Sequence, residues 1–202
     1  MKKGLLTDFG GVLTTNVFES FRAFCAAEGL PSDAVKRTFR ENPAALAELR
    51  ALERGDLSVA EFEPRFAPHL GLAEHEGLVE RLFAGVGPDE PMFEAVRRAH
   101  DAGVKTGVIS NSWGDTTYDV ADWRSLFDTI VISGEVGLHK PDPEIFQLAC
   151  DQLGLPPSDC VFIDDLRENC DGAESVGLTA ILHRGADSTL PKLEQLLGME
   201  LR

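Results

Sequence analysis

Residues 160 to 182 read CVFIDDLRENCDGAESVGLTAIL and contain a complete strand–helix–strand unit. Cys160 to Ile163 and Thr179 to Leu182 are short apolar runs, which are typical of strands in a parallel sheet covered on both faces. The segment between them predicts a helix from about Arg167 to Val176, which Gly177 ends. This unit indicates an α/β fold.

The same alternation extends through most of the chain. Three more apolar runs predict strands, at Leu5 to Phe9, Val104 to Ile109 and Thr129 to Ile132. Pro91 to Ala102 has a helical pattern, and Asp142-Pro143 begins a further helix, with the aspartate as N-cap, that Gly154 ends. We therefore expect a doubly wound parallel sheet, that is, a Rossmann-like core.

A long helical segment interrupts this alternation. Residues 17 to 84 lie between the first two predicted strands and look almost entirely helical, with Asn42-Pro43 beginning one helix and Ser58-x-x-Glu61 forming a capping box for the next. A crossover between parallel strands needs only one helix. The excess predicts a small all-helical subdomain inserted into the core. The expected boundaries are 16–85 for the insert and 1–15 with 86–202 for the core.

Composition and charge exclude several classes of protein. Apolar residues make up 43% of the chain and charged residues 26%, which argues against a disordered or low-complexity chain. The 19 basic and 34 acidic residues give a net charge of −15, whose field repels nucleic acid. The same field repels small phosphorylated molecules, so a site for them needs a metal ion or a well-placed cation.

The cysteines and the hydropathy pattern bear on the cellular compartment. Four cysteines occur without a CxxC motif, which fits neither a zinc site nor a redox motif and favours reduced thiols. The apolar run at the N-terminus is too short for a signal peptide and is interrupted by Asp8, and no later run is long enough to span a membrane. We expect a soluble, cytoplasmic protein.

Polar side chains follow four of the predicted strands. They are, in chain order, Asp8, Ser110 with Asn111, Lys140, and Asp164 with Asp165. Each has an ordinary explanation when taken alone: a turn for Asp8, an N-cap for the acidic pair, a solvated surface for Lys140. Ligands of open α/β sheets, however, bind outside the carboxyl ends of the strands, so we expect these side chains to converge there.

This set of residue types has a chemical meaning. Three carboxylates make an all-oxygen site suited to Mg²⁺, and the cation relieves the repulsion between them. A lysine and a serine beside such an ion can bind a phosphoryl group. A carboxylate can attack phosphorus and form an aspartyl phosphate.

Four segments together resemble the haloacid dehalogenase (HAD) superfamily. They are DFGGVL from Asp8, VISNS ending at Ser112, GLHKPDPEIF with Lys140, and VFIDDLRENCDGA with Asp164 and Asp165. The inserted helices resemble the cap of subfamily I members. The segments KPDPEIF and DDxxxN resemble the group that contains the phosphatase domain of epoxide hydrolases and bacterial sugar-1-phosphate phosphatases.

The resemblance implies a Mg²⁺-dependent phosphatase that hydrolyses a small phosphomonoester through an aspartyl-phosphate intermediate, with sugar phosphates among the candidate substrates. It implies that Asp8 is the nucleophile and a metal ligand, and that the carbonyl of Gly10 is a second ligand. Asp165 would bind the metal directly, with Asp164 as a further ligand or a supporting group.

The resemblance also implies roles for the remaining polar residues. Ser110 and the Asn111 amide would hold phosphoryl oxygens, and Lys140 would neutralise the phosphoryl group and the nucleophile. Asn169 would orient the acidic pair. Arg37 and Arg40 are interpreted as a solvated helix face rather than as substrate contacts.

Gly10 departs from the usual phosphatase pattern, in which a second aspartate two residues after the nucleophile protonates the leaving group. Metal ligation by the carbonyl survives this change, but the side-chain acid does not. Three explanations stay open: a slow enzyme, a leaving group that needs little protonation, or a substitute acid, with His139 or a residue of the inserted helices as candidates.

Two other functions stay open as well. A 2-haloacid dehalogenase needs no acid and therefore fits Gly10, but that reaction needs no metal, so the pair Asp164-Asp165 weighs against it. A degenerate, non-catalytic member of the superfamily that binds or regulates also fits Gly10. Trp113 is expected to pack rather than to stack on a substrate.

Overall fold

The computed structural model describes residues 1–114 and 123–202. Its centre is a parallel five-stranded sheet with the strand order β3-β2-β1-β4-β5. The strands are β1 Gly4–Thr7, β2 Lys105–Ser110, β3 Thr129–Ile132, β4 Cys160–Asp164 and β5 Thr179–Leu182. Each predicted apolar run forms one of these strands, and the predicted α/β fold with a doubly wound parallel sheet is confirmed.

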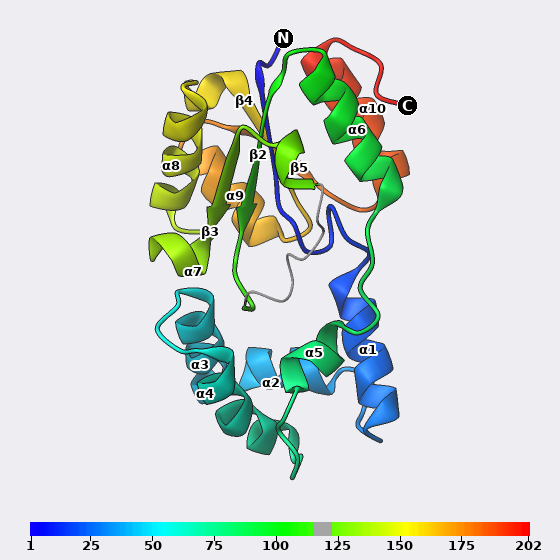
Figure 1. Cartoon of the computed structure of the whole chain (residues 1–202), viewed down its shortest axis with the longest axis vertical. Coiled ribbons are helices and arrows are strands. Elements are labelled where there is room, and N and C mark those ends of the chain that lie inside the picture. Colours follow the sequence, from blue (N-terminus) through cyan, green and yellow to red (C-terminus); the bar gives the residue numbers. More distant parts are fainter. Residues whose placement is uncertain (115–122) are drawn as a thin grey trace.

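Helices cover both faces of the sheet (Figure 1). They are α6 Glu90–Asp101 and α10 Ala186–Leu197 on one face, and α8 Pro143–Leu153 and α9 Arg167–Ser175 on the other. In β1, Leu5 packs toward the first pair and Leu6 toward the second, and both side chains are fully buried. Burial on both faces is the reason that the strands are continuous apolar runs.

The helices between β1 and α6 form a separate body with a core of its own (Figure 1). They are α1 Val17–Ala27, α2 Ala34–Glu41, α3 Pro43–Glu53, α4 Val59–Phe66 and α5 Leu78–Phe83. Phe62, Phe66 and Leu82 are fully buried in this core. Trp113, from the loop that follows β2, packs against it, so the sheet and the helical body share one side chain at their border.

Two of the three expected helix caps form as the sequence indicates. The Asn42 side chain accepts from the backbone N–H groups of Ala44 and Ala45 at 3.0 and 3.3 Å. Ser58 and Glu61 make the reciprocal capping box of α4. The prediction for Asp142 was wrong in one respect: α8 begins at Pro143, but the Asp142 side chain makes no capping hydrogen bond. Its carboxylate instead lies 3.5 Å from the Arg54 guanidinium of the helical body.

The end of α3 contacts the short helix α7, Ser133–Val136, which follows β3. The Ser133 hydroxyl donates to the backbone carbonyl of Glu53. Gly55 has a positive φ of 79°, and a Cβ built there would lie 2.7 Å from the carbonyl oxygen of Gly134. The helical body is therefore fixed against the sheet at this contact as well as through its chain connections.

We predict that Gly55→Ala destabilises the protein more than Gly71→Ala does. Gly71 also has a positive φ, of 74°, but no atom lies within 4 Å of a Cβ there, so its substitution reports backbone strain alone, on the order of 1–2 kcal/mol. At Gly55 the collision with the Gly134 carbonyl adds to that strain. Urea unfolding midpoints of both variants measure the difference, and equal midpoints would contradict the contact between α3 and α7.

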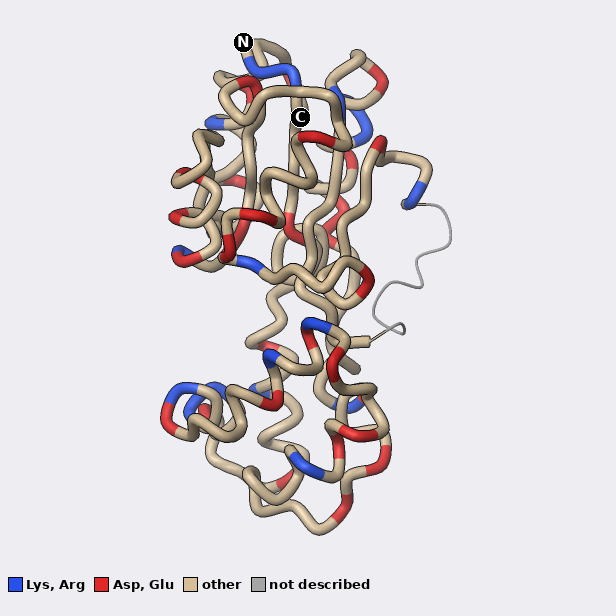
Figure 2. Tube along the Cα trace, turned by 90° about the vertical axis from the view of Figure 1, so that its left-hand side faces the viewer, with Lys and Arg blue, Asp and Glu red and all other residues tan. Residues whose placement is uncertain are grey.

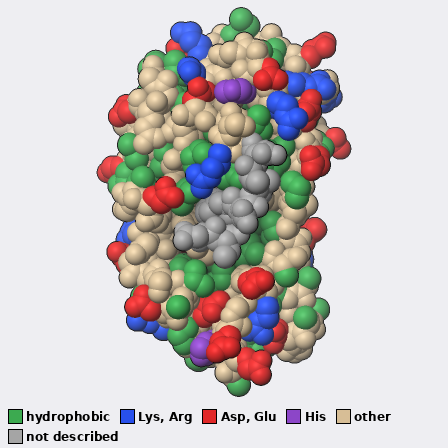
Figure 3. Space-filling view, viewed as in Figure 1, with side chains coloured by type: hydrophobic (Ala, Val, Ile, Leu, Met, Phe, Trp, Pro, Cys, Tyr) green, Lys and Arg blue, Asp and Glu red, His purple; other side chains and the backbone are tan. Residues whose placement is uncertain are grey.

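Acidic residues are distributed along both bodies of the molecule (Figure 2). On the face seen in Figure 3, acidic side chains are scattered rather than gathered in one patch. Among the described residues, no helix is both long enough and apolar enough to cross a membrane.

Candidate active site

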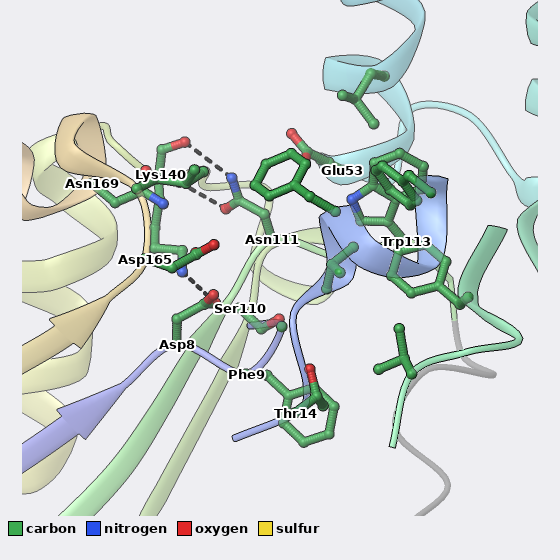
Figure 4. A pocket seen from close by; sticks show the side chains of 18 of the residues that line it. Asp8, Phe9, Thr14, Glu53, Ser110, Asn111, Trp113, Lys140, Asp165 and Asn169 are labelled. Carbon is green, nitrogen blue, oxygen red and sulfur yellow. Dashed lines mark hydrogen bonds and ion pairs between the residues drawn. The ribbon is translucent and has the colours of Figure 1, made fainter. Parts of the chain in front are cut away.

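The strand order brings the predicted polar residues together at one edge of the sheet. Asp8 directly follows β1, Ser110 is the last residue of β2, and Asp164 is the last residue of β4. Because β1 lies between β2 and β4, these three residues lie side by side. Asp165 and Lys140 complete the group from the loops that precede α9 and α8 (Figure 4).

Lys140 binds the two acidic strand ends to each other. Its Nζ donates to Oδ1 of Asp8 at 2.6 Å, to Oδ2 of Asp164 at 2.8 Å and to the carbonyl of Ile109 at 2.9 Å. The side chain is 1% exposed, so the ammonium is cut off from water and all three of its donors are used within the protein.

Asn111 fixes the backbone of Lys140. The Lys140 N–H donates to Oδ1 of Asn111 at 2.9 Å, and the Asn111 amide donates to the Lys140 carbonyl at 3.1 Å. Sequence reasoning had the Asn111 amide hold phosphoryl oxygens. Both hydrogen bonds of the Asn111 side-chain amide go to the backbone of Lys140. The predicted contact with phosphoryl oxygens therefore falls to the backbone N–H of Asn111.

The two acids of the pair have different surroundings. Asp164 is fully buried, and besides Lys140 its carboxylate accepts from the Asn169 amide at 3.0 and 3.1 Å and from the Leu166 N–H at 2.8 Å. Asn169 therefore holds the first acid of the pair. Asp165 instead lines the pocket described below.

Burial and crowding shift the protonation of this group. Burial raises the pKa of Asp8 to about 8; Lys140 opposes the rise, and the charges of Asp164 and Asp165 add to it. Burial and Asp164 raise the pKa of Asp165 to about 6. Burial alone would lower the pKa of Lys140, but Asp164 and Asp8 outweigh it and hold that pKa above its usual value. The ammonium is therefore permanently charged.

The acidic residues fit a divalent cation. Asp8, Asp164 and Asp165 each offer one carboxylate oxygen, and these oxygens lie within 4.8 Å of one another. One ammonium faces three carboxylates, so negative charge is in excess; after burial, which is the larger cause, the neighbouring acids add to the raised pKa values of Asp8 and Asp165. An all-oxygen donor set of this kind suits Mg²⁺.

The acids open onto a pocket of about 220 Å³ between the sheet and the helical body (Figure 4). Asp8, Ser110, Asn111, Lys140 and Asp165 line one end of it. The opposite wall is mostly apolar, with Val17, Phe18, Phe39, Leu49, Phe83 and Trp113 among its residues.

Trp113 is the centre of the apolar wall. Its ring lies 5.2 Å from that of Phe83, 5.8 Å from that of Phe21 and 5.9 Å from that of Phe39, measured between ring centroids. It packs, as the sequence indicated, and it also faces the pocket. Arg37 and Arg40 do not line the pocket and are exposed, as their interpretation as a solvated helix face implies.

Glu53 is a pocket residue that sequence reasoning missed. It is the one charged side chain that α1 to α5 bring to the described pocket wall, and Nε2 of His139 lies 2.7 Å from its Oε2. His139 does not line the pocket itself. Glu53 and His139 are 86 residues apart in the sequence and meet only in the folded protein, so a local sequence pattern could not predict their contact.

Gly10 leaves open space where a side chain would fit. A Cβ built on Gly10 meets only the Val17 methyl, at 3.5 Å, which is an ordinary contact distance, and its φ lies outside the left-handed region. The next residue differs: Gly11 has a φ of 79°, and its Cβ would lie 3.0 Å from Oδ2 of Asp165. Glycine is therefore needed at position 11 by the backbone, but not at position 10.

Comparison with known proteins identifies the family. The sequence model of the haloacid dehalogenase-like hydrolases matches residues 2–177, and the chain belongs to this family. The resemblance found in the sequence, and the enzyme class that it implies, a hydrolase, are confirmed.

Individual relatives match over shorter segments. The chain is 31% identical over 118 residues to bifunctional epoxide hydrolase 2 of Sus scrofa, which covers 55% of this chain and 21% of that protein. It is 32% identical over 105 residues to phosphatase MT3486 of Mycobacterium tuberculosis (strain CDC 1551 / Oshkosh), which covers 50% of this chain and 47% of the relative. The chain thus spans less than half the length of either relative.

Among solved structures, a HAD family enzyme of Bacteroides thetaiotaomicron in complex with magnesium and inorganic phosphate is similar. Its TM-score is 0.66 at 20% identity, and the match covers 90% of this chain and 93% of that one. At this identity the likeness concerns the fold.

The raised pKa of Asp8 predicts a pH dependence of stability. Its folded-state value of about 8 lies above the value of about 3.9 in an unfolded chain, so the stability that protonated Asp8 contributes is full below about pH 4 and is lost as the pH rises through 8. In EDTA we expect the free energy of unfolding to fall by an amount on the order of a few kcal/mol over this range.

Asp8→Asn provides the control, because the amide has a similar shape and does not titrate. Chemical denaturation at several pH values should give a flatter curve for the variant than for the parent protein. Saturating MgCl₂ should flatten the parent's curve too. Parallel curves for the two proteins in EDTA would contradict the assignment of the shift to Asp8.

Proposed function

We propose that this chain is a Mg²⁺-dependent phosphatase that hydrolyses a small phosphomonoester through an aspartyl-phosphate intermediate. One observation carries the proposal: the Asp8 carboxylate faces a pocket while Lys140 binds one of its oxygens and an acidic pair lies beside it. A buried carboxylate next to a lysine and further acids is arranged for attack on an anionic group that also needs a cation.

In the first step, a carboxylate oxygen of Asp8 attacks phosphorus, and the bond between phosphorus and the ester oxygen breaks. The alkoxide or phenolate leaves with the electron pair of that bond and takes a proton from water, which forms hydroxide. In the second step, water attacks the phosphorus of the aspartyl phosphate and gives up a proton to that hydroxide. The bond between phosphorus and the Asp8 oxygen breaks, which releases inorganic phosphate and restores the carboxylate. Throughout, Lys140 balances the charge of Asp8.

Other residues of the pocket supply binding and position. The Ser110 hydroxyl and the Asn111 backbone N–H would hold phosphoryl oxygens. Mg²⁺ held by Asp8, Asp165 and the Gly10 carbonyl would supply positive charge for the phosphoryl oxygens. Asp164 would position Lys140 and add negative charge beside the ion, since its oxygens accept hydrogen bonds from Lys140, Asn169 and Leu166.

The helices α1 to α5 complete the proposal as a cap. They place an apolar wall opposite Asp8, which removes water from the reacting group and strengthens the electrostatic interactions there. A 2-haloacid dehalogenase is less well supported by this site, because displacement of halide from carbon makes no use of three clustered carboxylates.

We predict that the protein hydrolyses p-nitrophenyl phosphate with Mg²⁺ and that EDTA abolishes this activity. Asp8→Asn should retain less than about 1% of kcat, because an amide oxygen is a poor nucleophile and loss of the attacking group is nearly total. Release of p-nitrophenolate measures both effects.

The control substrate is 2-chloropropionate, with chloride release as the readout. Turnover of the phosphate ester without a divalent ion, or full activity of Asp8→Asn, would overturn the proposed mechanism. Metal-independent chloride release in its place would identify a dehalogenase.

The open space at Gly10 predicts a steep dependence of rate on the leaving group. With no side-chain acid beside Asp8, the departing oxygen carries its charge, so log kcat/KM for substituted aryl phosphates should fall as the pKa of the phenol rises. Gly10→Asp, which the space above Gly10 can accommodate, should speed poor leaving groups preferentially, by up to roughly 10²-fold.

Gly10→Asn is the matched control, because it fills the same space without an ionisable group. A flat plot for the parent protein would show that another acid is present, and His139→Ala would then be the next variant. Equal acceleration of all substrates by Gly10→Asp would contradict the role assigned to the missing acid.

A further inference from the structure

We propose that the pocket selects phosphomonoesters whose organic group is small and apolar, and that it discriminates against sugar and polyol phosphates. This inference rests on the proposed function and concerns the part of the substrate that the cap surrounds.

The pocket wall opposite Asp8 consists mainly of aromatic and aliphatic side chains. Phe18, Phe39, Leu49 and Phe83 come to it from four different helices or helix ends, and Trp113 comes from the core loop after β2. The rings of Phe39 and Phe83 pack edge-on against that of Trp113, and Phe18 packs edge-on against Phe21, so the wall is a packed aromatic surface. Such a surface gains free energy by covering apolar groups and offers hydroxyls few hydrogen bonds.

The cap side of the pocket has few polar groups that could bind a substrate hydroxyl. Near the cap, the Thr14 hydroxyl accepts from the Gly11 N–H at 2.9 Å and donates to the Thr15 carbonyl at 3.1 Å. On the cap side, one carboxylate oxygen of Glu53 pairs with His139, and the Trp113 indole N–H is the other polar group of the described wall there. The remaining polar side chains of the described wall lie at the acidic end, where the phosphoryl group binds. A sugar carries several hydroxyls, so most of them would lie against apolar side chains in place of water.

The volume of the pocket suits a small organic group. A dry apolar cavity of about 150 Å³ binds benzene. The pocket measures about 220 Å³, which leaves room for a phosphoryl group with one ring or a short chain. The substrate class is therefore a phosphate ester of a phenol or of a short apolar alcohol.

Two esters with equally good leaving groups test this selectivity. 4-Ethylphenyl phosphate and 4-(hydroxymethyl)phenyl phosphate have nearly the same size and nearly equally basic phenolates, and differ by a methyl against a hydroxyl. With saturating Mg²⁺ we expect kcat/KM for the ethyl compound to be at least tenfold higher, because the methyl group gains free energy against the apolar wall while the hydroxyl loses hydration there. Hexyl phosphate should exceed glucose 6-phosphate in the same way.

Phe18→Ala tests the wall itself. Phe18 lines the pocket from α1, so its loss should lower kcat/KM for the ethyl compound about tenfold more than for acetyl phosphate, which is too small to reach the wall. Phe24→Ala is the control on the same helix, because Phe24 belongs to the cap core and does not line the pocket. It should affect both substrates alike.

The outcomes separate this inference from the function on which it rests. Hydrolysis of p-nitrophenyl phosphate together with equal or better turnover of the hydroxymethyl compound overturns the apolar selectivity and leaves the phosphatase intact. Failure to hydrolyse any phosphate ester overturns both. The comparison of esters uses the unaltered protein, so it stands even where a cap variant does not fold.

Discussion

A single buried ammonium organises this molecule. Lys140 bonds to Asp8 after β1, to Asp164 at the end of β4 and to the carbonyl of Ile109 in β2. The ammonium of Lys140 thus forms hydrogen bonds at or next to the carboxyl ends of three neighbouring strands. A buried charge is tolerated only when it is paired and its donors are satisfied, so these strand ends and the loop of Lys140 fix one another's positions.

The site contains more negative than positive charge. Lys140 balances one carboxylate, while Asp8, Asp164 and Asp165 together carry three when ionised. This local excess lies in a chain of net charge −15, so distant residues do not relieve it. The excess of negative charge therefore fits a divalent cation, and in the proposed function that cation would in turn attract a phosphoryl group.

Sequence reasoning found the parts of the site that depend on local pattern. Apolar runs mark strands, and the acids stand at fixed positions after them, so the topology alone brings Asp8 and Asp164 together. The pocket wall depends instead on contacts between distant segments. Trp113 packs against the cap core, and Glu53 pairs with His139. Neither contact can be predicted from the local hydrophobic periodicity. Asp142 stands at the N-cap position of α8, as the sequence indicates, but its carboxylate makes no capping hydrogen bond and lies beside Arg54 of the helical body. The roles of the site residues and the domain boundaries stay predictions.

Two features of the pocket point to the same kind of leaving group, although they arise from different parts of the chain. Gly10 provides no proton for the departing oxygen, and the wall around Trp113 provides few polar groups to stabilise its charge. Beside apolar side chains a localised alkoxide is costlier than in water, because these surroundings stabilise charge less. A phenolate spreads its charge over an apolar ring that the wall can cover. The absence of an acid and the aromatic wall are thus compatible with each other for weakly basic, apolar leaving groups, and would conflict for a sugar alkoxide.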